Sequence, residues 1–220
     1  MRWNPLLLIV TTAALFLAGS GVGSLEAATV LVSLDPAATY THTLNPASPG
    51  TGGAYNDSAP NSTSVDLAAM GITPGQLIRL TRLGAYQSQG AANPAEDNKL
   101  SLIAVFSSSS TISSDHTLLN RIPGAIDAGT DFVTNNNAIS GESSDITEDF
   151  LVASADGTQT FIEIIVPTGG AFLYFAVNDS YWADNKDPVD DFGASITLLP
   201  EPSSLGMLSI GAMVLVRRRR

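Results

Sequence analysis

Seven short runs of apolar and β-branched residues, separated by turn-forming residues, constrain the fold of this 220-residue chain more than any other feature. Each run has the length of a β-strand and is bounded by residues such as Gly, Pro, Asn and Ser. A single sheet built from these strands would leave one apolar face in water. The sequence therefore predicts an all-β domain over residues 29–199, folded as an antiparallel two-sheet β-sandwich. The runs cover residues 29–34, 77–83, 100–106, 150–153, 161–166, 172–177 and 194–199.

Two of these runs, residues 161–166 and 172–177, are almost continuously apolar, a pattern typical of strands buried on both faces. We expect them to form the centre of the core and to be joined as a hairpin through a turn at residues 167–171. One short helix is predicted over residues 65–70, because Gly71 would end it. The rest of the domain should be strands and their connections.

The composition excludes several classes of function. The chain contains no cysteine, so disulfides, thiolate metal sites and cysteine nucleophiles are impossible. Half of the basic residues lie at the two chain ends, and residues 29–199 hold 5 basic and 19 acidic residues, a net charge of −14. Because nucleic-acid binding needs a basic face that replaces the counterions of phosphate, we expect no nucleic-acid partner. A cation or a neutral polymer suits this surface better.

The first 28 residues have the three-part pattern of a Sec-type signal peptide. Arg2 precedes an apolar run over residues 6–18, and small residues then continue to Ala27 and Ala28. A core helix would need a polar face at helical spacing, and the apolar run has none. We therefore expect residues 1–28 to be a signal helix that the Sec translocon accepts and that is cleaved after Ala27 or Ala28.

The last 22 residues, 199–220, combine three features. Pro200, Glu201 and Pro202 form a stiff joint that continues neither a strand nor a helix. A short hydrophobic helix should follow over residues 205–216, and at 1.5 Å per residue it reaches about 18 Å, less than the roughly 30 Å hydrocarbon core of a bilayer. A basic tail ends the chain, and positive flanks favour the cytoplasmic side of a membrane. The tail consists of Arg217, Arg218, Arg219 and Arg220.

Together these three features resemble the PEP-CTERM sorting signal of Gram-negative and related bacteria. The resemblance implies export, transient insertion into the inner membrane, recognition by an exosortase-type transpeptidase, and release to the cell surface or extracellular matrix. Gly206 and Gly211 interrupt the apolar run, which is a departure from a long transmembrane helix. A loose basic tail is the alternative, but polar tails do not normally carry an apolar segment before the charges.

One loop, residues 178–193, concentrates carboxylate and amide oxygens directly after an expected buried strand. Such oxygens are hard ligands that suit Ca²⁺, which takes about six to eight of them. The spacing is not that of an EF-hand. In one interpretation Asp179, Asp184 and Asn185 converge on a calcium ion. In the other, the Asn and Asp residues only form turns between strands, as they commonly do in loops.

The same region resembles the C-terminal hairpin of small calcium-dependent, galactose-specific bacterial lectins and their galactose-binding-like relatives. The residues that carry the resemblance are Asn178-Asp179, Tyr181-Trp182, Asp184-Asn185, the run 192–197 and the upstream segment 79–86. The resemblance implies a jelly-roll type sandwich with Ca²⁺ held by Asp179, Asp184, Asn185 and the backbone carbonyl of Tyr86. A sugar would bind the exposed face of that ion. The inserted residues 186–191 depart from the lectin pattern.

Signals for catalysis are weak. The chain lacks the Gly-x-Ser-x-Gly elbow of a hydrolase, and the acidic residues of the segment 142–149 are expected on a solvated loop. His42 and His116, the only histidines, should be exposed polar residues. We therefore expect a non-enzymatic, exported protein of the cell surface or extracellular matrix. The alternative is a calcium-dependent carbohydrate-binding module for polysaccharide, and a glycan-active enzyme is the third hypothesis.

Overall fold

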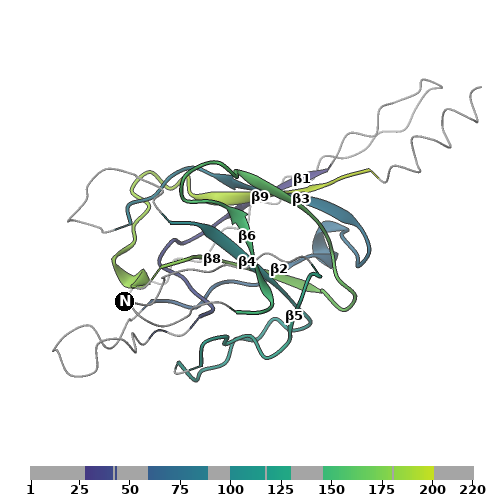
Figure 1. Cartoon of the computed structure of the whole chain (residues 1–220), viewed down its shortest axis with the longest axis horizontal. Helices are drawn as coiled ribbons and strands as arrows, with labels where there is room; N and C mark the ends of the chain where they lie inside the picture. Colours follow the sequence, from purple (N-terminus) through teal and green to yellow (C-terminus); the bar gives the residue numbers. More distant parts are fainter. Residues whose placement is uncertain are drawn as a thin grey trace, which may run out of the picture.

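Two antiparallel sheets pack face to face as a β-sandwich (Figure 1), which confirms the predicted fold class. The structure, a computed structural model, describes residues 28–41, 43, 59–88, 100–116, 118–129, 146–179 and 181–200. The signal helix expected over residues 1–28 and the hydrophobic helix expected over residues 205–216 lie outside the described residues, apart from Ala28. In the described residues, helical structure is limited to the 3₁₀ turns η1 (Ala68–Met70) and η3 (Trp182–Asp184).

The first sheet has four strands in the order β1-β9-β3-β7, so that β1 and β7 are its edges. The second sheet has the order β2-β8-β4-β5, and β6 also pairs with β4. The strands of the first sheet are β1 (Thr29–Ser33), β3 (Leu77–Leu83), β7 (Phe161–Ile165) and β9 (Gly193–Leu198). The strands of the second sheet are β2 (Val65–Asp66), β4 (Leu102–Ser107), β5 (Ala125–Ile126), β6 (Asp149–Ala153) and β8 (Phe172–Val177).

The expected hairpin between the two most apolar runs is wrong. β7 pairs with β3 in the first sheet, whereas β8 pairs with β4 and β2 in the second, so the residues between them cross from one sheet to the other. β7 is also an edge strand with alternating burial, in which Phe161 and Ile165 face outward. An apolar residue on an outer face looks the same in the sequence as one in the core, which is why the run was misleading.

The expected helix over residues 65–70 is shorter than predicted. Residues 65–66 instead pair with β8, and only η1 is helical. Gly71 ends η1 in the left-handed conformation (φ 73°), as the sequence indicated. Two or three residues are too few to nucleate an isolated helix, so the pairing with β8 decides the conformation.

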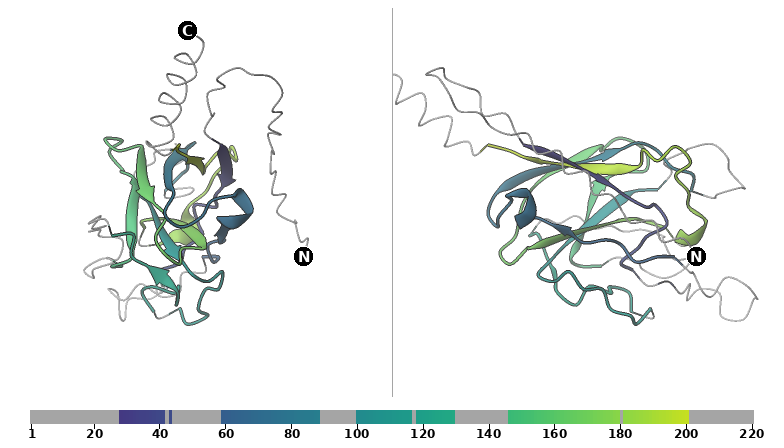
Figure 2. Two further views of the ribbon diagram at one scale, coloured as in Figure 1. Left: turned by 90° about the vertical axis from the view of Figure 1, so that its right-hand side faces the viewer. Right: turned by 180° about the vertical axis from the view of Figure 1, so that it is seen from behind.

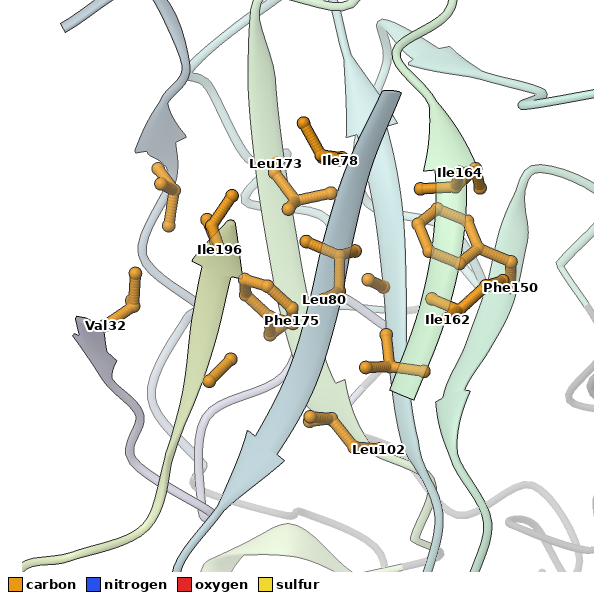
Figure 3. Packing of buried hydrophobic residues seen from close by; sticks show 14 of the residues in the cluster. Val32, Ile78, Leu80, Leu102, Phe150, Ile162, Ile164, Leu173, Phe175 and Ile196 are labelled. Atoms are coloured by element: carbon orange, nitrogen blue, oxygen red, sulfur yellow. The ribbon is translucent and has the colours of Figure 1, made fainter. Parts of the chain in front are cut away.

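The main hydrophobic core fills the space between the two sheets. Inward-facing side chains of the first sheet, among them Leu80 and Ile196, meet those of the second, among them Leu173 and Phe175 (Figure 3). Phe150 of β6 stacks on Phe106 of β4 with ring centroids 5.4 Å apart. Alternation along each strand supplies one apolar face to this core, which is the reason for two layers.

A second cluster covers the outer face of the second sheet. Ile103, Val105 and Tyr174 lie on that face and pack against residues of the connecting loops, including Tyr40 and Ile122. All six residues of β4 are therefore buried. Among the described residues, no such cluster covers β1 and β7 of the first sheet, where Leu31, Phe161 and Ile165 are exposed.

Ala28 and Leu199, which border the two segments expected to be processed, lie at one end of the sandwich, which we call the exit pole. Ala28 enters β1 and Leu199 follows β9, and these antiparallel strands start and end side by side (Figures 1 and 2). The other end, which we call the distal pole, holds the end of β8 and the start of β9, together with η3 between them. It is the end at which the predicted site residues lie.

Candidate functional site

The distal pole is built on β8, whose buried backbone leads directly into Asn178 and Asp179. These two polar residues are themselves only 4% and 8% exposed. Trp182 in η3 is buried beneath the loop, and its indole N–H donates a 2.7 Å hydrogen bond to the carbonyl of Val177. The large apolar ring thus fixes the loop to the end of the strand, which gives the polar residues around it defined positions.

Asp179 and Asn185 lie in direct contact. The Asn185 amide Nδ2 donates to Asp179 Oδ2 at 2.9 Å and to the carbonyl of Pro36 at 3.1 Å. The other carboxylate oxygen of Asp179 accepts from the backbone N–H of Tyr181 at 3.2 Å. Both Asp179 and Asn185 are buried, so this network joins the loop after β8 to the loop after β1 away from solvent.

The remaining atom of the Asn185 amide is unusual. Its oxygen, Oδ1, is buried and accepts no hydrogen bond. A buried acceptor without a donor costs about 1–3 kcal/mol. Turning the amide by half a revolution would exchange Oδ1 with Nδ2 and direct a third oxygen to the place where Asp179 Oδ2 and the Pro36 carbonyl already meet. Three oxygens around one point would attract a cation.

Tyr86 and Asp184, the other two predicted ligand residues, lie at the same pole. Tyr86 is fully buried, and its ring lies 4.7 Å from that of Phe192. The residues next in sequence form an antiparallel bridge, in which Gln87 N–H donates to Lys186 O at 2.8 Å and Lys186 N–H donates to Gln87 O at 3.0 Å. This bridge brings the backbone beside Tyr86 next to that beside Asn185. Asp184 ends η3 and is half-buried.

The inserted residues 186–191 form a closed turn. Asp187 accepts the backbone N–H of Asp190 on one oxygen and that of Phe192 on the other, each at 2.9 Å. Asp191 Oδ1 accepts the N–H of Ala85 at 3.2 Å. The insertion therefore ties the loop before β9 to the end of β3, and the carboxylates of Asp187 and Asp191 accept backbone N–H groups.

Many other carboxylates have the same role across the described residues. Asp156 accepts Ser154 Oγ and Thr158 Oγ1, each at 2.6 Å, and these hydrogen bonds lower its pKa to about 2. Asp35, Asp66 and Asp127 each accept a backbone N–H two or three residues further on. The turn interpretation of the acidic residues thus holds for much of the surface.

Sequence reasoning missed two buried ionisable groups in the layer outside the second sheet. Asp149 was expected on a solvated loop, but it begins β6 and is only 4% exposed. Burial, and after it the nearby charge of Asp149, raise the pKa of Tyr40 well above its usual value. The only sequence signal for the burial of Asp149 is the apolar run that directly follows it.

The second missed group is Arg121, whose side chain is fully buried. Its guanidinium donates to the carbonyls of Thr41 and Thr39 at 2.7 and 2.8 Å and to Asn61 Oδ1 at 2.6 Å. Burial lowers its pKa. Arg121 thus joins three loops through neutral oxygens. His116, which is exposed as expected, contacts its Nη1 through Nδ1 at 3.3 Å, whereas His42 lies outside the described residues.

Two further observations apply to the described ranges alone. Within them, no three side chains of His, Cys, Asp or Glu gather in a way that could hold a metal ion. The same ranges contain no helix with the length and apolar character needed to cross a membrane. A calcium site would therefore have to use amide and carbonyl oxygens beside Asp179, and calcium binding by the predicted residues stays a prediction.

The described residues thus form an all-β sandwich domain, and a C-terminal segment follows it directly in the sequence. The family model described as the PEP-CTERM protein-sorting motif matches residues 199–220, the segment that the sequence features indicated. The chain carries a PEP-CTERM motif, and such a motif implies an exported, cell-envelope-associated protein that is sorted by exosortase. No curated protein and no solved structure matches the chain. The likeness of the sandwich to galactose-binding lectins therefore stays a prediction.

Proposed function

We propose that the protein is a non-enzymatic component of the cell surface or extracellular matrix, delivered there by Sec export and exosortase processing. The observation that carries the proposal is the junction between domain and motif. β9 ends at Leu198 and the sorting motif begins at residue 199. Removal of the motif at or after Pro200-Glu201-Pro202 leaves every strand in the released product.

The exit pole supports this proposal. Ala28 and Leu199 both lie there, so the two terminal segments of the precursor leave the sandwich on the same side. A precursor held in the membrane by either segment would present its distal pole away from the bilayer. The loop around Asp179 and Asn185 would then be the part that meets the environment first.

The hydrogen bonds of the surface acids also support a structural or binding role. Carboxylates such as Asp156 and Asp187 accept backbone N–H groups within their own turns. These carboxylates fix the conformation of the loops through hydrogen bonds to the backbone. We infer that the loops of the distal pole provide a surface of defined form for recognition, with no part in bond cleavage.

The sorting half of the proposal is tested with the full chain in a bacterial host with and without its exosortase. We expect a released product that lacks the arginine tail only in the host with exosortase, as read by mass spectrometry. Replacing Pro200, Glu201 and Pro202 with Ala should retain the tail and keep the protein in the membrane fraction. Pro188→Ala, on an exposed loop of the domain, is the matched control and should be processed normally. Release of the tail from both variants would contradict the proposal.

The enzymatic alternative is tested with the released product. Incubation with bacterial exopolysaccharides should give no new reducing ends. Their appearance in proportion to protein concentration would show that the domain acts on glycans and would overturn the non-enzymatic proposal.

A second candidate function is calcium-dependent binding of carbohydrate at the distal pole. It is favoured by the buried Oδ1 of Asn185, which has no donor, beside the two oxygens that meet at Nδ2 of the same amide. A calcium ion at that point would be held by Asp179, Asn185 and the Pro36 carbonyl, with Asp184 and the backbone of Tyr86 as the other predicted ligands. A sugar hydroxyl could then complete the shell.

Residues 28–200 contain the nine strands that the structure describes and both hydrophobic clusters, and Trp182 is the single tryptophan of that range. Trp182 fluorescence and thermal unfolding therefore both report on calcium at this site. At a hundredfold excess over Kd, calcium should stabilise the domain by about 2.7 kcal/mol. Asp179→Asn should abolish the response, whereas Asp187→Asn, the control, should keep it. An equal response in both variants would place any calcium elsewhere, and no response in the wild type would end this candidate.

A further inference from the structure

In the part of the chain that the structure describes, β1 is an edge strand without the usual protection of an exposed sheet edge. It pairs with β9 on one side only. Edges are commonly guarded by charged residues or proline, and the sequence of β1, Thr-Val-Leu-Val-Ser, contains neither. Leu31 at its centre is 65% exposed, the highest value among the large apolar side chains of the described residues. The opposite edge, β7, does carry a charge at Glu163.

The backbone of β1 offers its open edge a regular set of donors and acceptors. Leu198 N–H donates to Ala28 O at 2.9 Å, and Leu34 N–H donates to Phe192 O at 3.1 Å, so the even-numbered residues bond toward β9. Backbone direction alternates along an antiparallel strand. The N–H and C=O groups of Thr29, Leu31 and Ser33 therefore point away from β9. No hydrogen bond joins them to another described segment.

We propose that the β1 edges of two copies pair antiparallel about a twofold axis at Leu31, which joins the two four-stranded sheets into one continuous sheet. In this register Leu31 lies opposite the partner's Leu31, and Thr29 lies opposite the partner's Ser33. The outward-pointing backbone groups of each strand then match those of the other. Val30 lies opposite the partner's Val32. Because the five-residue strand reads almost the same in both directions, each apolar residue meets an apolar one and each hydroxyl meets a hydroxyl.

The charge distribution favours this contact over others between two copies. Residues 29–199 carry a net charge of −14, so most faces of two copies repel each other, whereas β1 is uncharged. The register also places Ala28 opposite the partner's Leu34, next to the exposed carboxylate of the partner's Asp35. Signal-peptide cleavage after Ala27 would create an ammonium group at Ala28, so processing adds an attraction across the pair.

The antiparallel arrangement also fixes when pairing can occur. The exit pole of one copy lies beside the distal pole of its partner, so the two C-terminal segments leave in opposite directions. Two copies whose C-terminal segments are held in the same membrane cannot adopt this antiparallel arrangement. Pairing therefore follows release from the membrane, and only this timing depends on the proposed function. The association itself is a property of the sandwich.

The association is tested by sedimentation equilibrium on residues 28–200, which contain every strand. The wild type should change from monomer to dimer as its concentration rises. Leu31→Lys and Leu31→Glu each place like charges at the twofold axis and should weaken the dimer about tenfold or more. An equimolar mixture of the two variants should restore it, because Lys then faces Glu. Ile165→Lys, at a similarly exposed residue on the β7 edge, is the control and should dimerise like the wild type.

The register is tested by introducing a single cysteine into this cysteine-free chain. Leu31→Cys should give a disulfide-linked dimer on mild oxidation, since paired strand residues lie about 5.5 Å apart between Cα atoms. Ser33→Cys should not, because its two copies lie four residues apart in register, about 13 Å. A wild type that stays monomeric at millimolar concentration would overturn the proposal. So would a dimer that is insensitive to both Leu31 charges, or equal cross-linking of the two cysteine variants.

Discussion

The backbone N–H of Leu198 donates a 2.9 Å hydrogen bond to the carbonyl of Ala28. Ala28 borders the predicted signal peptide and Leu198 borders the sorting motif, although 170 positions of sequence separate the two residues. The hydrogen bond makes the entry and the exit of the domain neighbours on β1 and β9. The two segments that flank the sandwich in the sequence are therefore attached at one end of it, the exit pole.

This neighbourhood predicts that the domain tolerates circular permutation. A two-residue Asn-Gly link from Leu198 to Ala28 would make a hairpin turn. New ends in the exposed turn at residues 155–158 should then leave the sandwich intact, as judged by circular dichroism and cooperative unfolding. A permutant opened between Tyr86 and Gln87 is the control and should not fold, because its ends disrupt the bridge to Lys186. Failure of the first permutant alone would contradict the predicted adjacency.

Truncation of the Arg121 side chain should cause a large loss of stability. Arg121→Ala would remove the guanidinium that donates to the carbonyls of Thr39 and Thr41 and to Asn61 Oδ1 in the layer outside the second sheet. We expect the free energy of unfolding in urea to fall by about 3 kcal/mol or more. Arg79→Ala removes an exposed ion pair with Glu163 and should cost about 1 kcal/mol or less. Similar losses for the two variants would show that the buried network contributes little.

We expect position 84 to accept no side chain. Its φ is +61°, and an added Cβ would lie 2.2 Å from the carbonyl oxygen of Asp191. Gly84→Ala should therefore lower the free energy of unfolding by about 3 kcal/mol or more, through strain and overlap. Gly157 has a similar φ of +72° with nothing within 4 Å of the added Cβ, so Gly157→Ala should cost only about 1–2 kcal/mol. Thermal denaturation of the two variants gives the comparison.

We expect ionisation of Tyr40 in the unfolded chain to lower the stability of the domain at alkaline pH. Burial and the nearby Asp149 carboxylate raise its pKa in the folded protein above the value of about 10 in the unfolded chain. Its contribution is fully present below about pH 10 and is lost as the pH rises, since only the unfolded state then releases the proton. Tyr40→Phe should reduce the decline of the unfolding free energy between about pH 9 and 11. Part of the decline should remain, because burial also raises the pKa of Tyr174. An unchanged decline would exclude Tyr40 as a source.

The stability that Asp156 contributes should depend on pH in the opposite direction, with a loss in acid. Its pKa of about 2 is set by hydrogen bonds from Ser154 and Thr158. The stability that it contributes is present above about pH 4, where the unfolded carboxyl is ionised, and is lost as the pH falls toward 2. In the Ser154→Ala, Thr158→Ala double variant the pKa should return toward 4, as measured by NMR titration of the Asp156 carboxyl. A pKa that stays near 2 would show that the two hydroxyls are not its cause.

Local patterns in the sequence predicted most strands with good accuracy. The expected runs 77–83 and 172–177 coincide with β3 and β8, and the boundaries of the other five differ by two residues or fewer. Strand length and bounding turn residues are local properties, so they can be read without knowing the partner strands. The candidate site was foreseen only as a group of residues. The contact of Asn185 with Pro36 joins positions 149 apart, and no spacing indicates it.

The class of fold, the acidic character of the domain and the sorting motif at residues 199–220 follow from the amino-acid sequence alone, because each depends on composition or on contiguous residues. Which strands share a sheet is visible only in the folded domain. Folding separated β7 from β8, buried Asp149 and Arg121, and left β1 as an uncharged edge. Strand pairing and burial depend on contacts between residues far apart in the chain, and several arrangements satisfy the same alternation of apolar and polar residues.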